Sequence, residues 1–370
     1  MRIRRVTEEG KTMGYGQSFG RAAYGFQRVG AACGLAALLM AALPVSAAHA
    51  DTAADPVDDV IITGAGSSFA APLYGGWSTA AQKAVGVRVN YQAIGSGAGQ
   101  NLVSVGTVDF GASDAPMVHE RLVSTGLLQV PTAIGGIVVT ANVPGVPAGA
   151  LRLTGPVLAD IYAGRITQWD DAQLVALNPD VTLPDLAIAP LHRADGSGTT
   201  YVFTDYLSRV SSSWHNGVGR GMSVDWPTGA GARGNDGIAA YVRNTEGSIG
   251  YVEYAYAAHN NLTGLQIRNQ AGSFVRPTVE TFSHAAESAH WDAEDMTATL
   301  CDAPGAESWP IVTTTYVLLP AHATEDNKGE AVRRFFRWAV KDGGTIGRSL
   351  DYVPLPPQVA SAVIERLERH

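Results

Sequence analysis

Short apolar runs recur along the chain, and glycine with serine or threonine often follows them before a helical spacing of apolar residues begins. Strands are predicted over residues 60–63, 87–93, 108–112, 130–141, 186–191, 248–254 and 313–319. Helices are predicted over residues 69–84, 100–105, 154–162, 201–210, 238–243, 328–340 and 357–369. The repeated order of a strand, a Gly/Ser turn and a helix favours an α/β fold with a parallel sheet. Two glycines, Gly135 and Gly136, are expected to break the strand over 130–141.

Residues 1–50 have the pattern of a signal peptide. Basic residues precede an apolar run over residues 29–45, and Ala48-His49-Ala50 has the form of a cleavage site before Asp51. We therefore expect export to the periplasm. A retained membrane anchor is the alternative, although the apolar run is short for a spanning helix. Met13 could be the true start in place of Met1.

Length and charge narrow the function further. A chain of 370 residues is typical of two domains. Its formal net charge of −8 argues against nucleic acid as a partner, because binding to phosphodiester backbones needs clustered positive charge. Only two cysteines occur, and Cys33 lies in the predicted leader, so Cys301 would be left without a disulfide partner.

The segment from His192 to Thr200 is the strongest candidate for a binding element. Gly196 and Gly198 allow a sharp turn, and Ser197 and Thr199 are good residues for starting a helix. A helix start attracts anions, and Arg193 adds a planar set of donors that Asp195 could hold in place. The alternative is a capped helix with a surface ion pair and no ligand. His192, beside Arg193, is most simply a flanking residue.

Three turns share this design and centre on Ser68, Ser96 and Ser197. Because ligands collect at the carboxyl ends of strands in open α/β sheets, the three hydroxyl-bearing turns could converge on one small oxyanion. Ordinary βα connections of glycine and serine are the alternative.

Signals for an enzyme, a metal or a cofactor are poor. The chain has no phosphate-binding GxxxxGK[ST] loop and no GxSxG nucleophile motif. The acidic and histidine residues over 284–295 have no familiar metal-ligand spacing and are expected to form a solvated face. We therefore expect no catalytic residues, no metal and no cofactor.

Several of these segments together resemble the phosphate-binding protein of the high-affinity bacterial phosphate ABC transporter, the PstS family. The resemblance rests on TGAGSSFAAP (63–72), IGSGAG (94–99), VDFGASDAP (108–116) and RADGSGT (193–199), with further likeness in GNDGIAAY (234–241) and GYVEYAY (250–256). It covers residues 58–365 in order.

The resemblance implies a type II periplasmic-binding fold, with two α/β lobes joined by a two-strand hinge. Lobe I would comprise residues 51–134 and 316–370, and lobe II residues 135–315. The phosphate-binding residues that it implies are Ser68, Phe69, Ser96, Asp114, Arg193, Asp195, Ser197, Gly198 and Thr199. Of these, Ser68 and Phe69 would bind through backbone N–H groups and Asp195 would pair with Arg193.

The resemblance also implies the substrate-binding component of a phosphate importer. Its partners would be inorganic phosphate and the permease subunits in the inner membrane, with no nucleic acid, and the protein would be a monomer. A secreted phosphatase, or a binder of sulfate or another tetrahedral oxyanion, is the alternative.

Asp114 is the least expected member of this set, because a carboxylate repels an anion. An ionised carboxylate can only accept hydrogen bonds, so it fits a ligand that brings a proton. Phosphate near neutral pH carries one or two protons and sulfate carries none. Asp114 could therefore select phosphate, or it could merely cap the turn before Pro116.

Overall fold

A computed structural model describes residues 60–322 and 328–369 of the chain. The described residues all belong to one compact unit. The predicted leader and its cleavage site lie outside the described residues. Within the described residues, no helix has both the length and the apolar character needed to cross a membrane.

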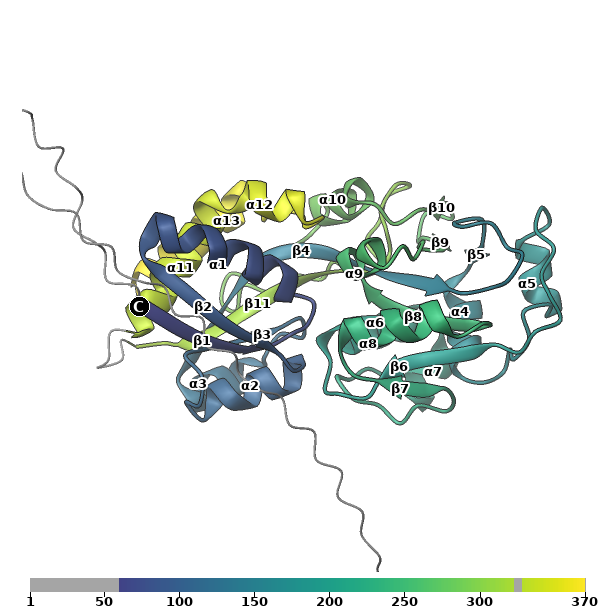
Figure 1. Cartoon of the computed structure of the whole chain (residues 1–370), viewed down its shortest axis with the longest axis horizontal. Coiled ribbons are helices and arrows are strands. Elements are labelled where there is room, and N and C mark those ends of the chain that lie inside the picture. The colour runs from purple at the N-terminus through teal and green to yellow at the C-terminus, as the bar shows by residue number, and fades with distance from the viewer. Residues whose placement is uncertain (1–59, 323–327, 370) are drawn as a thin grey trace, which may run out of the picture. The chain divides into compact units, whose positions relative to one another are not determined.

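An eight-stranded sheet organises the described residues, with the strand order β2-β1-β3-β11-β4-β8-β6-β7 (Figure 1). Its strands are β1 (Val60–Gly66), β2 (Val87–Ala93), β3 (Phe110–Ser113), β4 (Leu127–Ala141), β6 (Ala189–Arg193), β7 (Ala230–Ala232), β8 (Ser248–Glu253) and β11 (Val312–Pro320). A three-stranded sheet contains β5 (Arg152–Leu153), β9 (Gln266–Arg268) and β10 (Phe274–Val275).

Helices follow most of the strands. They are α1 (Ala71–Val85), α2 (Ser96–Ser104), α3 (His119–Thr125), α4 (Gly155–Tyr162), α5 (Ala172–Leu177), α6 (Gly198–Val210), α7 (Ser212–Gly217), α8 (Gly234–Asn244), α9 (Tyr254–His259), α10 (Val279–Glu287), α11 (Lys328–Asp342), α12 (Gly344–Ser349) and α13 (Pro357–Arg369). Helix α1 ends at Val85, one residue beyond the predicted end, and Gly86 closes it in a left-handed conformation with φ of 64°. On α11, the residues Val332, Phe335, Phe336 and Ala339 are buried.

Two groups of parallel strands form the two ends of the large sheet. We call β2, β1 and β3 the first half-sheet and β8, β6 and β7 the second half-sheet. Strand β1 is parallel to both β2 and β3, and β6 is parallel to both β7 and β8. The α/β prediction is therefore confirmed in each half, and the carboxyl ends of these strands carry the predicted turns.

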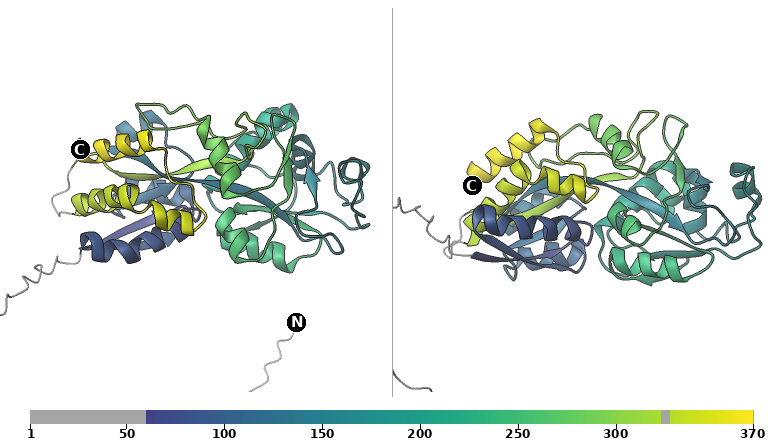
Figure 2. Two further views of the ribbon diagram at one scale, coloured as in Figure 1. Left: turned by 90° about the horizontal axis from the view of Figure 1, so that it is seen from above. Right: turned by 45° about the horizontal axis from the view of Figure 1, so that its top comes forward.

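Strands β4 and β11 connect the two half-sheets (Figure 2). Residues Tyr316–Leu318 of β11 pair with β3, whereas residues Ile137–Ala141 of β4 pair with β8. The register between β11 and β4 shifts between Thr315 and Tyr316. Strand β4 thus changes its pairing partner along its length, from β11 over Leu127–Gly136 to β8 over Ile137–Ala141.

Several sequence predictions about the elements are wrong, among them the start of α8, which begins at Gly234 instead of residue 238. Strand β4 runs through Gly135 and Gly136 without a break, because these glycines make room for rings: a Cβ there would lie 2.7 Å from Phe69 and 2.2 Å from Phe282. Helix α2 begins at Ser96 instead of residue 100. Gly99 lies within this helix and packs so closely on β1 that a Cβ there would lie 2.5 Å from Gly66 Cα. The glycine therefore allows the helix to contact the sheet and does not belong to a loop.

Candidate functional site

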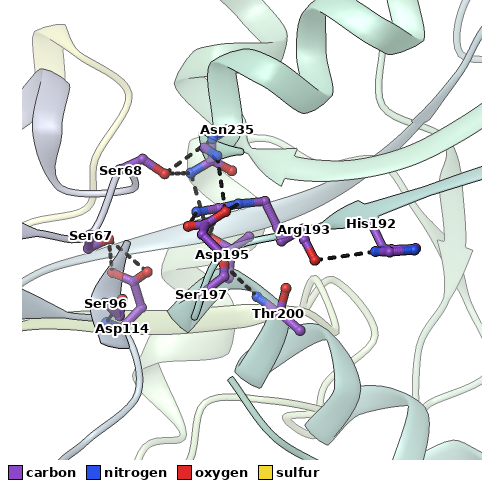
Figure 3. A network of polar contacts seen from close by, with 12 residues as sticks. Ser67, Ser68, Ser96, Asp114, His192, Arg193, Asp195, Ser197, Thr200 and Asn235 are labelled. Atoms are coloured by element: carbon purple, nitrogen blue, oxygen red, sulfur yellow. Dashed lines mark hydrogen bonds and ion pairs between the residues drawn. The ribbon is translucent and has the colours of Figure 1, made fainter. Parts of the chain in front are cut away.

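The residues singled out from the sequence converge where the two half-sheets face each other (Figure 3). Ser68 and Phe69 follow β1, Ser96 begins α2 after β2, and Asp114 follows β3. Arg193 ends β6, and Ser197 to Thr199 form the start of α6. The polar side chains of this set are at most 4% exposed, with the exception of the half-buried Asp195. The structure therefore brings all nine predicted site residues to one region.

Arg193 is held by Asp195, as its place two residues away predicted. Arg193 Nε donates to Asp195 Oδ1 at 2.7 Å, and Arg193 Nη2 pairs with Asp195 Oδ2. The backbone N–H of Gly234 also donates to Asp195 Oδ1, at 3.1 Å. Burial alone would raise the pKa of Asp195, but the hydrogen bonds and positive charge of Arg193 outweigh it, and the pKa lies below its ordinary value. These contacts fix the direction of the guanidinium, which points into the site. Its Nη1 lies 3.4 Å from Thr199 Oγ1.

The start of α6 supplies backbone donors beside Arg193. Ser197 is the N-cap, and its Oγ accepts the N–H of Thr200 at 3.1 Å. The N–H groups of Gly198 and Thr199 precede the first intrahelical acceptor, so the helix itself cannot satisfy them. A helix start of this kind favours an anion.

Asp114 lies in a cage of hydroxyl groups. Ser67 Oγ donates to its two carboxylate oxygens at 2.6 and 2.8 Å, and Thr315 Oγ1 donates to Oδ1 at 2.8 Å. The backbone N–H of Asp114 donates to Ser96 Oγ at 3.3 Å. Burial raises the pKa of Asp114 to about 6, although the hydroxyl groups and Arg193 partly oppose this rise. The side chain is thus built into the site instead of capping the turn before Pro116.

Ser68 accepts hydrogen bonds from residues of α8 and α9, which lie beside the second half-sheet. Its Oγ accepts the backbone N–H of Asn235 at 3.2 Å and the side-chain Nδ2 of Asn235 at 2.9 Å. The hydroxyl of Tyr256 donates to the carbonyl oxygen of Ser68 at 2.7 Å. These contacts join the turn after β1 to α8 and α9.

Glycines allow the two halves to approach backbone to backbone. The N–H of Gly97 donates to the carbonyl oxygen of Gly196 at 2.8 Å. A Cβ on Gly198 would lie 2.5 Å from Ser96 Oγ and 2.6 Å from Asp114 Oδ2. No larger residue fits at Gly198 without separating these groups.

Taken together, the site offers a fixed guanidinium, hydroxyl groups and helix-start N–H groups, with one carboxylate as an acceptor. Such a set can hold a small oxyanion that also carries a proton for Asp114.

Comparison with known proteins identifies the family. A sequence profile described as the PBP superfamily domain matches residues 45–342. The chain is 48% identical over 303 residues to the phosphate-binding protein PstS of Pasteurella multocida, covering 82% of this chain and 88% of that protein. It is also 48% identical over 303 residues to PstS of Haemophilus influenzae, covering 82% and 91% respectively. The chain belongs to the PstS family of phosphate-binding proteins.

Solved structures agree with the fold. A periplasmic phosphate-binding protein called PfluDING, bound with phosphate, has a TM-score of 0.65 and 18% sequence identity, covering 82% of this chain and 93% of that chain. At this identity the likeness concerns the fold alone. Together with the family profile, it gives this PstS-family chain the type II periplasmic-binding fold that was predicted.

Sequence reasoning missed three side chains of this PstS-family site. Ser67 and Thr315 hold Asp114, and Asn235 holds Ser68. Ser67 stands beside the predicted Ser68, and Asn235 lies in the GNDGIAAY segment at the start of α8, so both were near recognised motifs. Thr315 lies in the middle of β11, where threonine is an ordinary strand residue, and no sequence signal distinguishes it.

Other groups lie apart from this chemistry. The ring of His192 stacks on Trp226, with 4.8 Å between centroids, in agreement with a flanking role. Within the described residues, no group of three or more His, Cys, Asp or Glu side chains could hold a metal ion.

Proposed function

We propose that this protein binds inorganic phosphate between its two half-sheets and delivers it to the permease of a phosphate ABC importer. The observation that carries the proposal is the buried convergence of Arg193, the α6 start and the Ser68 and Ser96 turns around Asp114. Its relatives in Pasteurella multocida and Haemophilus influenzae are phosphate-binding proteins, which supports the same ligand here.

We assign phosphate contacts to Ser68, Phe69, Ser96, Asp114, Arg193, Ser197, Gly198 and Thr199, with Asp195 holding Arg193. The donors would replace the hydration shell of the anion, and burial would strengthen each bond because little water screens it. Asp114 would accept the proton that the phosphate carries.

Binding would couple to closure of two lobes. The proposed lobes are residues 51–134 with 316–370, and residues 135–315. Both proposed boundaries fall within the connecting strands, and the second coincides with the register shift between Thr315 and Tyr316. Ligand would favour the closed arrangement by contacting groups from both lobes at once.

The protein would act as a monomeric binder in the periplasm, without catalytic activity, cofactor or nucleic-acid partner. Its partners would be phosphate and the permease subunits of the inner membrane. We expect the mature chain to begin near Asp51. N-terminal sequencing of the periplasmic fraction tests this cleavage, and a full-length chain in washed membranes would contradict it.

Calorimetry of the mature protein with phosphate, arsenate and sulfate tests the proposal. We expect tight binding of phosphate and much weaker binding of sulfate. Tight binding of sulfate alone would assign another oxyanion to the site. Turnover of p-nitrophenyl phosphate would instead support a phosphoryl-transfer enzyme.

A further inference from the structure

Asn235 makes an unusual pair of contacts with one hydroxyl oxygen. Its backbone N–H and its side-chain Nδ2 both donate to Ser68 Oγ, at 3.2 and 2.9 Å (Figure 3). Both residues are buried. Asn235 comes from the first turn of α8, whereas Ser68 comes from the turn after β1, so these bonds connect the two half-sheets.

The orientation of the Asn235 amide is fixed by its other end. Its Oδ1 accepts the backbone N–H of Glu253 at 3.1 Å, so the group that faces Ser68 must be the NH₂. The same Nδ2 lies 3.5 Å from Thr199 Oγ1. The amide can therefore only donate toward Ser68, and it cannot turn over without losing the Glu253 contact.

A serine hydroxyl has two acceptor positions and one hydrogen. At Ser68, Asn235 fills both acceptor positions, so the oxygen has no acceptor capacity left. Its hydrogen must be donated to some other group. In a site that holds an oxyanion, this arrangement leaves the Ser68 hydroxyl as a donor to the ligand.

We propose that Asn235 is a positioning residue that makes Ser68 an obligate hydrogen-bond donor to the bound anion and ties the two half-sheets together when the site is closed. The inference rests on the proposed binding of phosphate. Asn235 would act through Ser68, and the loss of Asn235 would affect phosphate chiefly where Ser68 is present. Because the bond spans the closed site, its loss would speed release of the ligand more than it slows binding.

A double-mutant cycle tests this role. Stopped-flow and equilibrium measurements would follow phosphate binding by wild type, Ser68→Ala, Asn235→Ala and the double variant. We expect each single variant to bind about 5- to 50-fold more weakly, mainly through faster dissociation. The double variant should bind about as weakly as the weaker single variant, because Asn235 has no hydroxyl to direct once Ser68 is gone.

Two further variants separate positioning from folding. Asn244 lies at the other end of α8, where its side chain is exposed and donates to the carbonyl of Ala240 at 2.8 Å. The control variant Asn244→Ala should therefore leave phosphate binding unchanged. Asn235→Asp preserves the shape and can still accept from Glu253, but an ionised carboxylate cannot donate to Ser68. Relative to the matching Asn235 protein at each pH, it should bind phosphate poorly at pH 8 and recover part of the affinity at low pH. Loss of the negative charge beside the anion contributes to this recovery in any background, so the recovery should be smaller, but not absent, when Ser68→Ala is also present.

The outcomes distinguish this inference from the proposed function. If wild type binds no phosphate, the proposed function fails. If wild type binds phosphate but the losses of Ser68→Ala and Asn235→Ala simply multiply, Asn235 does not act through Ser68 and the inference is wrong. If Asn235→Ala does not fold, the pH profiles of Asn235→Asp with and without Ser68 still decide the question, and identical profiles would overturn it.

Discussion

The hydroxyl of Ser67 points at the carboxylate of Asp114, at 2.6 Å from Oδ1 and 2.8 Å from Oδ2. Thr315 adds a second hydroxyl to Oδ1 at 2.8 Å. These donors stabilise the ionised form of a carboxyl that burial would otherwise keep neutral, and the balance leaves its pKa at about 6. Near neutral pH, Asp114 is therefore an acceptor at the centre of a site composed largely of donors.

Asp114→Asn should narrow the preference for phosphate over sulfate, mainly by admitting sulfate. An ionised carboxylate facing a sulfate oxygen would place two acceptors together with no hydrogen between them, whereas an amide can donate. Calorimetry with both anions at one pH and one salt concentration checks this. An unchanged ratio of the two affinities would remove Asp114 from ligand selection.

Sulfate binding by the wild type should strengthen as the pH falls through about 6. Below its pKa the neutral Asp114 carboxyl can donate to an anion that has no proton, and above it the carboxylate repels that anion. Asp114→Asn cannot titrate at this position and should lack the change. Sulfate titrations between pH 8 and pH 5, with both proteins compared at each pH, measure the difference.

Arg193→Ala should abolish tight phosphate binding and leave the fold intact. The substitution removes charge-assisted hydrogen bonds to the ligand and leaves Asp195 without its arginine partner beside an anion. We therefore expect the free energy of phosphate binding to weaken by roughly 2–5 kcal/mol. Ser68→Ala removes one neutral donor and should cost less, on the order of 1–2 kcal/mol. Calorimetry with circular dichroism as a folding check compares them, and equal losses would refute the role of Arg193.

Gly198→Ala should weaken phosphate binding strongly although it adds a single methyl group. That carbon would lie within 2.6 Å of both Ser96 Oγ and Asp114 Oδ2, so the two half-sheets would have to separate. Gly75→Ala on α1 is the matched control, since nothing lies within 4 Å and alanine favours a helix by about 1 kcal/mol. Comparable phosphate affinities for the two variants would show that close approach at Gly198 is not needed.

Glu253 should make the protein less stable as the pH rises. Burial, with smaller effects of the negative Asp114 and Asp351, raises the pKa of Glu253 to about 8 from an ordinary value of 4.5. The folded state therefore holds a proton that the unfolded state releases above pH 4.5, and this stabilisation is lost as the pH rises toward 8, by up to about 1.4 kcal/mol per pH unit.

Glu253→Gln should make the free energy of unfolding depend less on pH, because the amide has no proton to lose in this range. Urea unfolding of both proteins between pH 6 and pH 9 gives the comparison. The window begins at the pKa of Asp114, which is about 6, so the part of the curve above pH 7 reports mainly on Glu253. Parallel stability curves for the two proteins would contradict the assignment.

The sequence alone determined most of the predicted elements, and it singled out most of the residues that the structure brings together. The strand over residues 87–93 and the helix over 357–369 occur as predicted, because apolar periodicity and glycine or proline boundaries act over a few residues. Ser68, Ser96, Arg193 and Ser197 were recognisable for the same reason. Each lies in a short strand–turn–helix unit whose geometry is set by its own residues.

Only the tertiary structure decided which residues hold these groups in place. Thr315 reaches Asp114 from 201 positions away, and Asn235 reaches Ser68 from 167 positions away. Similarly, Gly135 and Gly136 pack against the rings of Phe69 and Phe282 and do not interrupt β4. Hydrogen bonding and close packing between distant segments depend on how the strands are ordered in the sheet, and local periodicity carries no information about that order.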